Sequence, residues 1–589
     1  MLRTHTCGEL TDKSISKKVT LCGWVDSRRD HGNLIFIDLR DRWGKTQLVF
    51  NPEKNREVHN TAEKLRPEFV VQVHGVVQKR PEGTQNLKIK TGQIEVEVTE
   101  LQILNTSEVL PFEIMDDSPV SEEIRLKYRY LDLRRPVMLK RLETRHRITK
   151  IVRDYLDELK FIEVETPMLT KSTPEGARDF LVPSRLTEGT FYALPQSPQL
   201  FKQILMISSF DRYFQLARCL RDEDLRADRQ PEHTQIDIEM SFVSEDDIIS
   251  IIEGLLARII KTIRGIDIKT PFPRLSYQDA MNRFGSDKPD LRFGLEFRDA
   301  TSILAASELK IFQEVFKQKG VIKGLGISGQ NFARSDFDRL TAFVQGFGAK
   351  GLAWIKVTAD GIESPIAKFI KPDEQKKLIA LFEAKTGDTI FLIADQWLTT
   401  CTALGALRNQ LASELKLISQ TKELNLAWVV DFHLFQWNEE EKRLDAVHHP
   451  FTAPQEKDLP FLEKEPLKVR ARAYDIILNG TEIGGGSIRI HQEEVQKKMF
   501  QSLGITKQEA EGKFGFLLRA LRFGAPPHGG IAIGLDRLCA ILEGVESIRD
   551  VIAFPKTQKG ICPMTEAPSK VSAKQLKELG LQVKTQQGG

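Results

Sequence analysis

The sequence predicts an α+β protein of several domains, with a small β-barrel in its N-terminal part. Its 589 residues are too many for a single hydrophobic core, which predicts two to four domains. Short alternating apolar runs fill the first hundred residues, whereas helical and strand-like patterns are mixed in the rest. Hydrophobic residues make up 41% of the chain and charged residues 28%, which is typical of a globular protein.

The N-terminal domain, residues 1–106, contains five short strand-like runs separated by turn-forming stretches. The runs are residues 19–25, 34–39, 47–50, 70–77 and 95–101. Five short strands with loops are typical of a small barrel, and the OB-fold is the commonest such barrel. Phe36 shares a strand face with Asp38 and Arg40, so it could stack on a nucleic-acid base or be exposed without a function.

Changes in composition divide the rest of the chain. Prolines and mixed charges predict a hinge at residues 107–135, and a Lys- and Gly-rich stretch predicts an inserted α+β domain at 290–420. Segments 136–289 and 421–589, on either side of the insertion, are expected to form one larger domain, with a polar extension at the C-terminal end. Helical spacing of apolar residues predicts helices at 142–159, 245–264 and 573–579.

A loop rich in arginine is expected between two strands, residues 219–223 and 234–242. It carries Arg226 and Arg229 beside Arg221, and the guanidinium group matches the oxygens of phosphate. The second strand alternates in polarity. One face would carry Gln235, Asp237, Glu239 and Ser241, and the other Ile236, Ile238, Met240 and Phe242. A polar face is also normal at the surface of a sheet, so the alternation alone does not indicate a site.

The dipeptide Asn479-Gly480 between apolar residues predicts a two-residue β-hairpin. Such a turn would place Asp475 and Glu482 on one face, diagonally adjacent. Two neighbouring carboxylates repel unless a cation lies between them, and hard oxygen ligands select magnesium or calcium. The alternative is two solvated acids on an exposed hairpin. A bulge at glycines 484–486 would reverse the face of Arg489, so the pattern leaves its direction open.

Residues 529–538 predict a glycine-rich strand, a tight turn and a helix that ends at Gly544. Arg537 would lie in the first turn of this helix, where backbone N–H groups also attract anions. Packing alone would also explain such a turn, so this feature is weak evidence by itself.

Together, these segments resemble the three motifs of the class II aminoacyl-tRNA synthetases, and more specifically the bacterial aspartyl-tRNA synthetases. Helix 142–159 with residues 161–167 resembles motif 1, residues 221–239 resemble motif 2, and residues 534–537 resemble motif 3. Further stretches similar to the aspartyl enzymes are 172–180, 196–202, 448–451 and 484–489. The resemblance covers the whole chain. It implies an OB-fold anticodon-binding domain and an antiparallel-sheet catalytic domain with the bacterial kind of insertion.

The resemblance implies that ATP and Mg²⁺ are used to activate L-aspartate, which is then transferred to tRNA through aspartyl-adenylate. Arg221, Glu223 and Arg537 would be catalytic, and Asp475 and Glu482 would hold magnesium. The residues expected to bind ATP are Arg221, Asp222, Glu223, Gln230, His233, Glu482, Gly534, Leu535, Asp536 and Arg537. In the first step the aspartate carboxylate is itself the nucleophile, so no general base is needed.

The residues expected to bind aspartate are Glu175, Ser197, Gln199, Lys202, Arg221, Asp237, His448 and Arg489. Lys202 and Arg489 would form a buried, doubly positive clamp on the side-chain carboxylate, which the neutral amide of asparagine cannot satisfy. One departure from the family is His233, at the position where a Phe usually stacks on adenine. Imidazole can also stack, and we expect its stacking to depend on pH.

In the barrel, Arg29, Phe36 and Gln47 match the family's anticodon-reading residues. Bacterial enzymes strict for tRNA-Asp tend to have Leu and Lys where this chain has His31 and Gly83, and those with His and Gly tend to accept tRNA-Asn too. The resemblance therefore implies a non-discriminating enzyme that makes Asp-tRNA-Asn for an amidotransferase, and a homodimer built through motif 1. The alternative is a discriminating enzyme strict for tRNA-Asp.

Several other classes of protein are disfavoured. No run of eighteen apolar residues exists to span a membrane, and six scattered cysteines are expected to be reduced thiols in the cytoplasm. A net charge of +3 does not by itself indicate a nucleic-acid binder. A non-catalytic RNA-binding paralogue would usually lack Arg221 or Arg537. The pair Lys202 and Arg489 argues against an asparagine- or lysine-specific relative, and the barrel argues against an ammonia-dependent asparagine synthetase.

Overall fold

The computed structural model describes residues 1–173, 177–305, 307–418 and 423–583. The chain forms two compact units, Met1–Leu142 with Cys562–Glu566, and Glu143–Ile561 with Ala567–Gly589. Within the described ranges, no helix is both long and apolar enough to cross a membrane.

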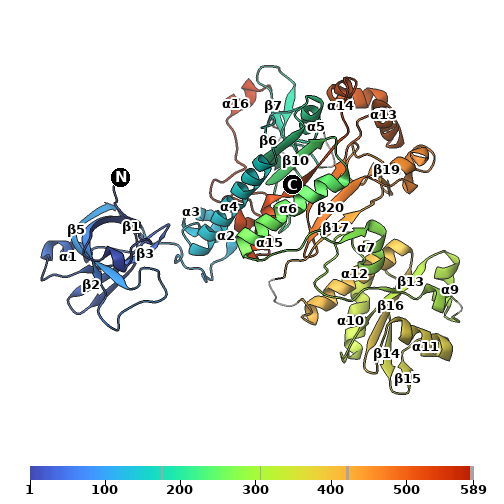
Figure 1. The fold of residues 1–589 in the computed structure, drawn as a ribbon, viewed down its shortest axis with the longest axis horizontal. Coiled ribbons are helices and arrows are strands. Elements are labelled where there is room, and N and C mark those ends of the chain that lie inside the picture. Colours follow the sequence, from blue (N-terminus) through green and yellow to red (C-terminus); the bar gives the residue numbers. More distant parts are fainter. Residues whose placement is uncertain (174–176, 306, 419–422, 584–589) are drawn as a thin grey trace. The chain divides into compact units, whose positions relative to one another are not determined.

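A closed five-stranded barrel forms the core of the first unit (Figure 1). In barrel order, the strands are β1 (Lys18–His31), β2 (Leu34–Asp41), β3 (Gly44–Phe50), β5 (Ile94–Asn105) and β4 (Val70–Lys79). Inward side chains alternate along each strand, as in β2, where Ile35, Ile37 and Leu39 are buried. The predicted barrel of five strands is confirmed, and the short helix α1 (Arg56–Ala62) lies between β3 and β4 in the chain.

Three helices follow the barrel in the chain, namely α2 (Glu122–Lys127), α3 (Arg129–Asp132) and α4 (Pro136–Glu158). Helix α4 begins at Pro136, earlier than the predicted start at residue 142, because proline is well suited to the first position of a helix. Its apolar residues Ile148, Val152 and Leu156 are buried in the core of the second unit.

An eight-stranded, mainly antiparallel sheet organises the second unit. Its strands, in order, are β11 (Arg274–Ser276), β17 (Leu426–Val430), β20 (Ala473–Leu478), β21 (Thr481–Ile488), β22 (His528–Gly534), β10 (Glu232–Ser241), β9 (Arg212–Leu220) and β6 (Ile162–Glu163). Only the two edge strands, β11 and β6, pair in parallel with their neighbours among the described strands of this sheet. Segments from both sides of the insertion therefore contribute strands to one sheet.

Helices cover one face of this sheet. Helix α6 (Glu245–Arg264) has the predicted bounds and runs beside α4 (Figure 1), where Arg258 pairs with Glu158 at 2.8 Å. Apolar residues of α4, α6 and α15 (Leu535–Glu543) share one core with Ile236, Ile238 and Met240 of β10. The polar side chains of β10 must therefore point to the opposite face.

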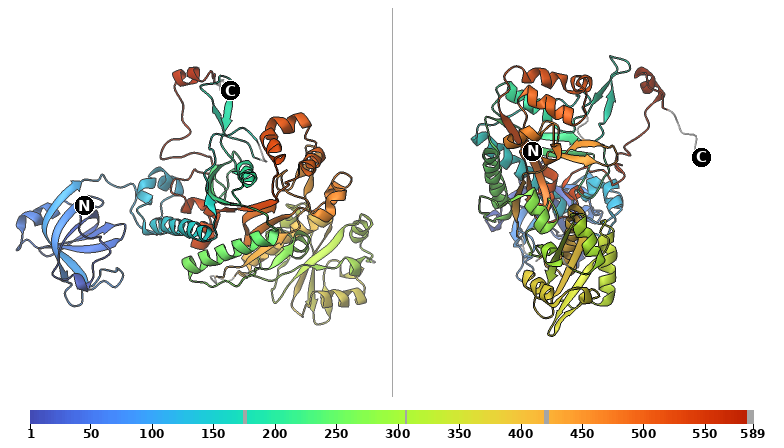
Figure 2. Two further views of the ribbon diagram at one scale, coloured as in Figure 1. Left: turned by 45° about the horizontal axis from the view of Figure 1, so that its top comes forward. Right: turned by 90° about the vertical axis from the view of Figure 1, so that its right-hand side faces the viewer.

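A second, five-stranded sheet is the centre of the insertion. Its strands, in order, are β12 (Arg298–Asp299), β13 (Val321–Ile327), β16 (Thr389–Asp395), β14 (Ala353–Thr358) and β15 (Gly361–Glu363). Apolar residues of α10 (Arg334–Gln345) and α12 (Trp397–Glu414) form one core with this sheet. Those of α8 (Thr301–Leu304), α9 (Lys310–Lys317) and α11 (Pro372–Leu381) form a second. Helices therefore pack on both faces of this sheet (Figure 2), and the domain bounds 290–420 stay a prediction.

Shorter elements complete the second unit. They are β7 (Leu181–Pro183), β8 (Phe191–Ala193), α5 (Gln199–Ile207), α7 (Tyr277–Phe284), β18 (Phe435–Asn438), β19 (Arg443–Ala446), α13 (Glu493–Ser502), α14 (Lys507–Leu521) and α16 (Ala573–Glu578). Helix α16 agrees with the helix predicted at 573–579.

Candidate functional site

The face of the large sheet opposite its helices carries the polar side chains of β10. Asp237 and Glu239 lie opposite Ala532 and Gly530 of β22, whose small side chains leave room above the sheet. Both acids are 0% exposed, so the interpretation of this strand as a solvated polar surface is wrong. The predicted alternation also ends early, because Phe242 has a φ of 58° and is 77% exposed.

Two buried cations face these acids. Nζ of Lys202, on α5, lies 2.9 Å from Oδ1 of Asp237 and 3.4 Å from Oε2 of Glu239. Arg489 donates from Nε and Nη2 to the two carboxylate oxygens of Glu239, at 3.0 and 3.1 Å. These four residues are named the charge cluster. Burial opposes ionisation of Glu239, but Arg489 and Lys202 hold its pKa below the usual value.

The charge cluster adds two acids to the predicted doubly positive clamp, whose contact with aspartate stays a prediction. Lys202 and Arg489 do lie together, but two acids of β10 face them: Glu239 is held ionised, whereas burial raises the pKa of Asp237 above its usual value. The physical reason is that two buried cations without acidic partners would strongly destabilise the fold while no substrate is bound. Glu239 had no predicted role, although it shares the polar face with Asp237.

A neutral histidine also holds Arg489. Nη1 of Arg489 donates to Nε2 of His449 at 2.8 Å and to Oγ of Ser487 at 2.6 Å. Burial, followed by the charge of Arg489, lowers the pKa of His449 well below 6.5, so this ring accepts the hydrogen bond. The adjacent His448 approaches Asp475, with 3.6 Å between Nε2 and Oδ1, and its expected contact with aspartate stays a prediction.

Strands β20 and β21 form the predicted two-residue hairpin at Asn479-Gly480, whose φ values are 52° and 75°. A bulge at Ile483 shifts the register, so that Asp475 lies opposite Gly485. A Cβ atom at Gly485 would lie 2.6 Å from Oδ1 of Asp475 and 3.8 Å from Oε1 of Glu482. The two carboxylates therefore converge over this glycine, on the face that the spacing predicted.

The carboxylate pair suits a hard cation. Asp475 is buried, which excludes the alternative of two solvated acids, and its Oδ1 has no hydrogen-bond partner in the described part of the chain. Residues 1–173, 177–305, 307–418 and 423–583 contain no group of three or more His, Cys, Asp or Glu placed to hold a metal. Two carboxylates still fit magnesium, because it takes its other ligands from water and substrate phosphates.

Cationic side chains surround Glu482. Nζ of Lys288 lies 2.8 Å from its Oε2, and Arg537 donates from Nη1 to its backbone oxygen. Burial opposes ionisation of Glu482, but Lys288 and then Arg537 lower its pKa. Arg537 also lies 3.3 Å from Oδ2 of Asp228, in the arginine-rich loop. Lys288 and Asp228 lie outside the predicted site residues, and no pattern around them indicated a role.

The arginine-rich loop joins β9 to β10, which pair as the predicted antiparallel hairpin. Nε of Arg221 is buried and has no hydrogen-bond partner among the residues that the structure describes, so it can receive an anion. Gln230 holds the loop in place, because its amide donates to the Lys556 oxygen at 3.0 Å and accepts from the Lys556 N–H at 2.7 Å. The expected contact of Gln230 with the nucleotide stays a prediction.

Two further predicted ATP ligands in this loop are engaged with arginines. Oε2 of Glu223 lies 3.4 Å from Nη1 of Arg229, and Oδ2 of Asp222 lies 3.7 Å from Nε of Arg178. All four side chains remain at least partly exposed, so these pairs can open at little cost.

The strand-to-helix turn at Gly534 is confirmed, and Gly544 ends α15 with a φ of 69°. Leu535 packs in the core below the turn. Asp536 uses both carboxylate oxygens inside the protein. Oδ1 pairs with Nη1 of Arg145 on α4, and Oδ2 accepts from the Thr234 N–H at 2.9 Å. This geometry supports a structural role that joins the three motif segments, and the expected contact of Asp536 with ATP stays a prediction.

His233 lies on β10, opposite Cys219. Burial, followed by the nearby charge of Arg221, lowers its pKa from 6.5 to about 4. The ring is therefore neutral at physiological pH. The expectation that its stacking depends on pH is wrong in the neutral range, because the environment has moved the titration far below it.

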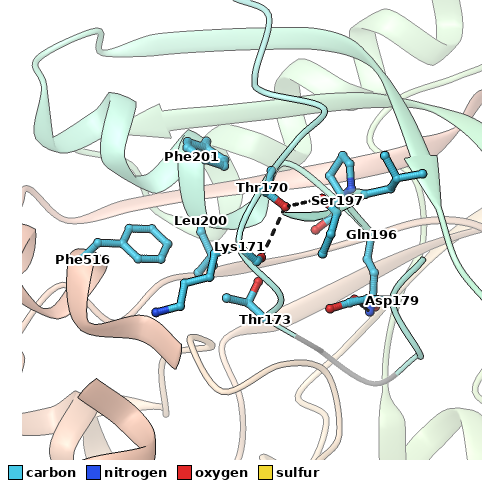
Figure 3. A pocket seen from close by; sticks show the side chains of 12 residues that line it. Thr170, Lys171, Thr173, Asp179, Gln196, Ser197, Leu200, Phe201 and Phe516 are labelled. Carbon is cyan, nitrogen blue, oxygen red and sulfur yellow. Dashed lines mark hydrogen bonds between the residues drawn. The ribbon is translucent and has the colours of Figure 1, made fainter. Parts of the chain in front are cut away.

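A pocket of about 250 Å³ lies beside the site (Figure 3). Phe201 and Phe516 border it on one side, and Gln196 and Asp179 on the other. Of the residues expected to bind aspartate, Ser197 lines this pocket. Gln199 follows Ser197 at the start of α5, and its backbone N–H donates to the Ser197 hydroxyl at 3.3 Å. Glu175 lies outside the described residues.

The three residues expected to read the anticodon are neighbours on the barrel. Arg29 lies opposite Phe36, and Asp38 lies opposite Gln47. Nη2 of Arg29 donates to Oδ1 of Asp38 at 3.0 Å and to Oε1 of Gln47 at 3.3 Å. One side of β1, β2 and β3 thus combines an aromatic ring, a cation and an amide.

The two residues expected to set tRNA choice are exposed, His31 as the last residue of β1 and Gly83 in a turn of the first unit. The His31 ring lies 6.1 Å from the Phe36 ring, edge to face. Gly83 has a φ of 83°, and no atom lies within 4 Å of a Cβ atom placed on it. A larger side chain at Gly83 would point into open space.

Comparison with known proteins agrees with this architecture. The family model of the class II tRNA synthetases (D, K and N) matches residues 121–558, and that of the OB-fold nucleic acid binding domain matches residues 19–104. An Aspartate--tRNA(Asp/Asn) ligase of Desulfatibacillum aliphaticivorans is 56% identical over 99% of this chain and 98% of its own length. One of Geobacillus sp. (strain WCH70) is 55% identical with the same coverage.

Solved structures show the same fold. The asparaginyl-tRNA synthetase of Pyrococcus horikoshii, complexed with asparaginyl-adenylate, has a TM-score of 0.59 at 19% identity, covering 95% of this chain and 99% of its own. A putative aspartyl-tRNA synthetase of Leishmania major Friedlin has a TM-score of 0.59 at 17% identity, covering 94% of each chain. With the family model covering the whole of the large sheet, this chain belongs to the class II tRNA synthetases of the D, K and N group.

Proposed function

We propose that this chain uses ATP to attach L-aspartate to tRNA through aspartyl-adenylate, and that it accepts both tRNA-Asp and tRNA-Asn. The observation that carries the proposal is the charge cluster, in which Lys202 and Arg489 are buried beside the sheet of a class II synthetase. Relatives with more than half of their residues identical over almost the full chain are Aspartate--tRNA(Asp/Asn) ligases.

Aspartate would bind over the charge cluster. Its side-chain carboxylate would accept hydrogen bonds from Lys202 and Arg489, while Glu175, Ser197, Gln199 and Asp237 would surround its ammonium group, with His448 closing the pocket. Glu239 and His449 fix the guanidinium of Arg489 in advance, so little reorganisation is needed. Asparagine would direct an amide N–H group at these donors, which would leave buried donors unpaired.

ATP would bind between the arginine-rich loop and the turn before α15. Arg221 has an unpartnered buried Nε for the α-phosphate, and Arg537 would contact the γ-phosphate. Asp222, Glu223, Gln230, His233, Gly534, Leu535 and Asp536 would complete the nucleotide site. Asp475 and Glu482 would hold magnesium, which when bound supplies positive charge to the phosphates.

The first chemical step needs no general base. A carboxylate oxygen of aspartate attacks the α-phosphorus, and pyrophosphate leaves while Arg221 and Arg537 stabilise the developing charge. In the second step the terminal hydroxyl of tRNA attacks the acyl carbon of the adenylate, its proton passes to the adenylate's own phosphate, and AMP leaves. We therefore assign catalytic roles to Arg221, Glu223 and Arg537, with Glu223 orienting the nucleotide.

Recognition of tRNA would start at the barrel. Phe36 offers a ring for stacking an anticodon base, with Arg29 and Gln47 beside it. His31 borders Phe36, which supports its proposed effect on tRNA choice. An enzyme that makes Asp-tRNA-Asn requires an amidotransferase to convert the product, and we infer this functional coupling.

We also propose a homodimer and a division into domains. Helix α4 and the edge strand β6, whose Ile162 is 50% exposed, would form the dimer interface. The proposed domains are an anticodon-binding barrel at 1–106, a hinge at 107–135, catalytic parts at 136–289 and 421–589, and the insertion at 290–420.

Aminoacylation of purified tRNA-Asp and tRNA-Asn transcripts, measured side by side, tests the function. We expect aspartate to be attached to both at rates within about tenfold, corresponding to about 1.4 kcal/mol. A rate for tRNA-Asn thousands of times lower would show a discriminating enzyme. The double variant His31→Leu/Gly83→Lys should lose activity on tRNA-Asn more than on tRNA-Asp. Its aspartate-dependent exchange of pyrophosphate into ATP, measured without tRNA, is the control and should not change.

A further inference from the structure

Among the described residues, Lys288 is the only lysine or arginine whose side chain forms an ion pair with the carboxylate of Asp475 or Glu482. Its Nζ lies 2.8 Å from Oε2 of Glu482. The other carboxylate, that of Asp475, is paired among the described residues only with His448, whose Nε2 lies 3.6 Å from Oδ1. Without a metal, this acidic group therefore depends on Lys288 for its charge balance.

The segment that carries Lys288 is held on both sides. Nη2 of Arg408, on α12 of the insertion, donates to the backbone oxygens of Asp290, Phe293 and Gly294 at 2.8 to 2.9 Å. On the other side, Asp290 touches the hairpin that bears the two carboxylates, because a Cβ atom on Gly480 would lie 2.9 Å from Cβ of Asp290. The position of Lys288 is thus set by the fold of the insertion, whereas its ammonium group can move.

Building on the proposed function, we propose that Lys288 is a built-in counter-ion of the Asp475 and Glu482 pair, which holds the place of magnesium and sets the affinity for it. Divalent cation and ammonium group compete for the same oxygen of Glu482. The side chain of Lys288 is 42% exposed, so it can leave towards solvent or towards the phosphates when the metal enters with ATP. Arg408 acts on this exchange only through the backbone, as a positioning residue.

The proposal gives the insertion a place in the activity. Through Arg408 it positions Lys288, a cation outside the strands of the large sheet that keeps two converging carboxylates together before substrate binds. Removing that cation makes the net charge around the two carboxylates more negative, so the site attracts divalent ions more strongly. A residue that merely packed against the hairpin would not change metal affinity in this direction.

The experiment is a titration of the nucleotide-free, full-length protein with MgCl₂ alone, followed by calorimetry and by the shift in thermal unfolding temperature. We expect Lys288→Met to bind magnesium about tenfold more tightly than the wild type, as the loss of one partly screened charge at contact distance implies. Lys288→Arg should behave as the wild type. The matched control is Lys261→Met, because Lys261 pairs with Asp267 at the same distance of 2.8 Å but at an exposed site.

Unchanged or weaker magnesium binding by Lys288→Met would overturn the proposal. Tighter binding that persists in Lys288→Met/Glu482→Gln would also overturn it, because the effect would then not come from Glu482. The titration contains neither aspartate nor tRNA. Failure of the proposed function would appear separately, as the absence of aspartate-dependent pyrophosphate exchange by the wild type.

Discussion

Arg489 and Glu239 meet through two parallel hydrogen bonds, Nε to Oε1 at 3.0 Å and Nη2 to Oε2 at 3.1 Å. Both side chains are almost completely buried, at 2% and 0% exposure. The pair leaves Nη1 of Arg489 directed at Ser487 and His449, beside the ammonium group of Lys202. The direction of the cation is thus set before any substrate arrives.

We expect Arg489→Lys to lower kcat/KM for aspartate activation by about a hundredfold or more. Lysine keeps the charge but cannot make two parallel bonds to Glu239 while also reaching His449. Aspartate-dependent pyrophosphate exchange measures the effect. Arg472→Lys is the matched control, since Arg472 makes a similar two-bond pair with Glu245 at a less buried site. Near-wild-type exchange by Arg489→Lys would contradict the assigned role.

Glu239→Gln should lower the free energy of unfolding by about 3 kcal/mol, because it leaves two buried cations with one fewer acid. Urea denaturation measures this. The control, Asp458→Asn, alters a two-bond pair with Arg470, whose side chain is 35% exposed, and should cost about 1 kcal/mol or less. Equal losses of unfolding free energy in the two variants would show that the charge cluster contributes no more to stability than a partly exposed ion pair.

Gly485→Ala is expected to weaken the response to magnesium with little loss of stability. The added methyl group would lie 2.6 Å from Oδ1 of Asp475, which can yield by rotating its side chain, and the carboxylate pair would then separate. The magnesium concentration for half-maximal exchange should rise several-fold. In contrast, Gly484→Ala would press on the Ala532 backbone oxygen at 2.7 Å and should destabilise the fold. A wild-type magnesium requirement in Gly485→Ala would refute the placement of the metal.

His233→Phe should make the free energy of unfolding less dependent on pH. In the wild type, the folded pKa of about 4 lies below the usual 6.5, so the unfolded chain takes up a proton first as the pH falls from 6.5 to 4. Stability is therefore lost through this window. The difference in free energy of unfolding, variant minus wild type, should therefore be about 2 kcal/mol larger at pH 5 than at pH 7.5. Parallel pH curves for the two proteins would falsify the prediction, and His74→Phe, at an exposed position, serves as the control.

Phe36→Ala should raise KM for tRNA by about ten- to a hundredfold, since stacking of one base contributes about 1–3 kcal/mol. Exchange of pyrophosphate without tRNA should stay unchanged, because Phe36 belongs to the barrel unit and not to the large sheet. Trp43→Ala removes another exposed aromatic of the barrel and is the control. A loss of exchange in Phe36→Ala would indicate misfolding instead of lost stacking.

Local patterns predicted most of the fold. The barrel strands, the hairpin at Asn479-Gly480 and helix α6 follow from side-chain period and turn chemistry, which act between residues close in the chain. Groups that meet only in the folded protein gave no such pattern. Glu239 lies 250 positions from Arg489, and its burial could not be seen from alternation alone. Lys288 lies in a connecting segment without any motif, and its partner Glu482 is on β21, far along the chain.

The low pKa of His233 illustrates the same limit. Its residue type suggested a titration near neutrality, whereas burial and Arg221 decide the actual protonation state. The sequence predicted that Lys202 and Arg489 lie together, and they do. That acids of β10 pair with them could be known only from the register of the sheet.

The charge cluster also restricts how such a pocket could evolve towards a different amino acid. Neutralising Glu239, Lys202 or Arg489 leaves a partner of opposite charge in a dry interior, so such a single substitution destabilises the protein before it can alter selectivity. Acid and base must be exchanged together, and the two changes are not additive. A change of amino acid in this lineage therefore requires compensatory double mutations, which makes the choice of aspartate difficult to lose by stepwise drift.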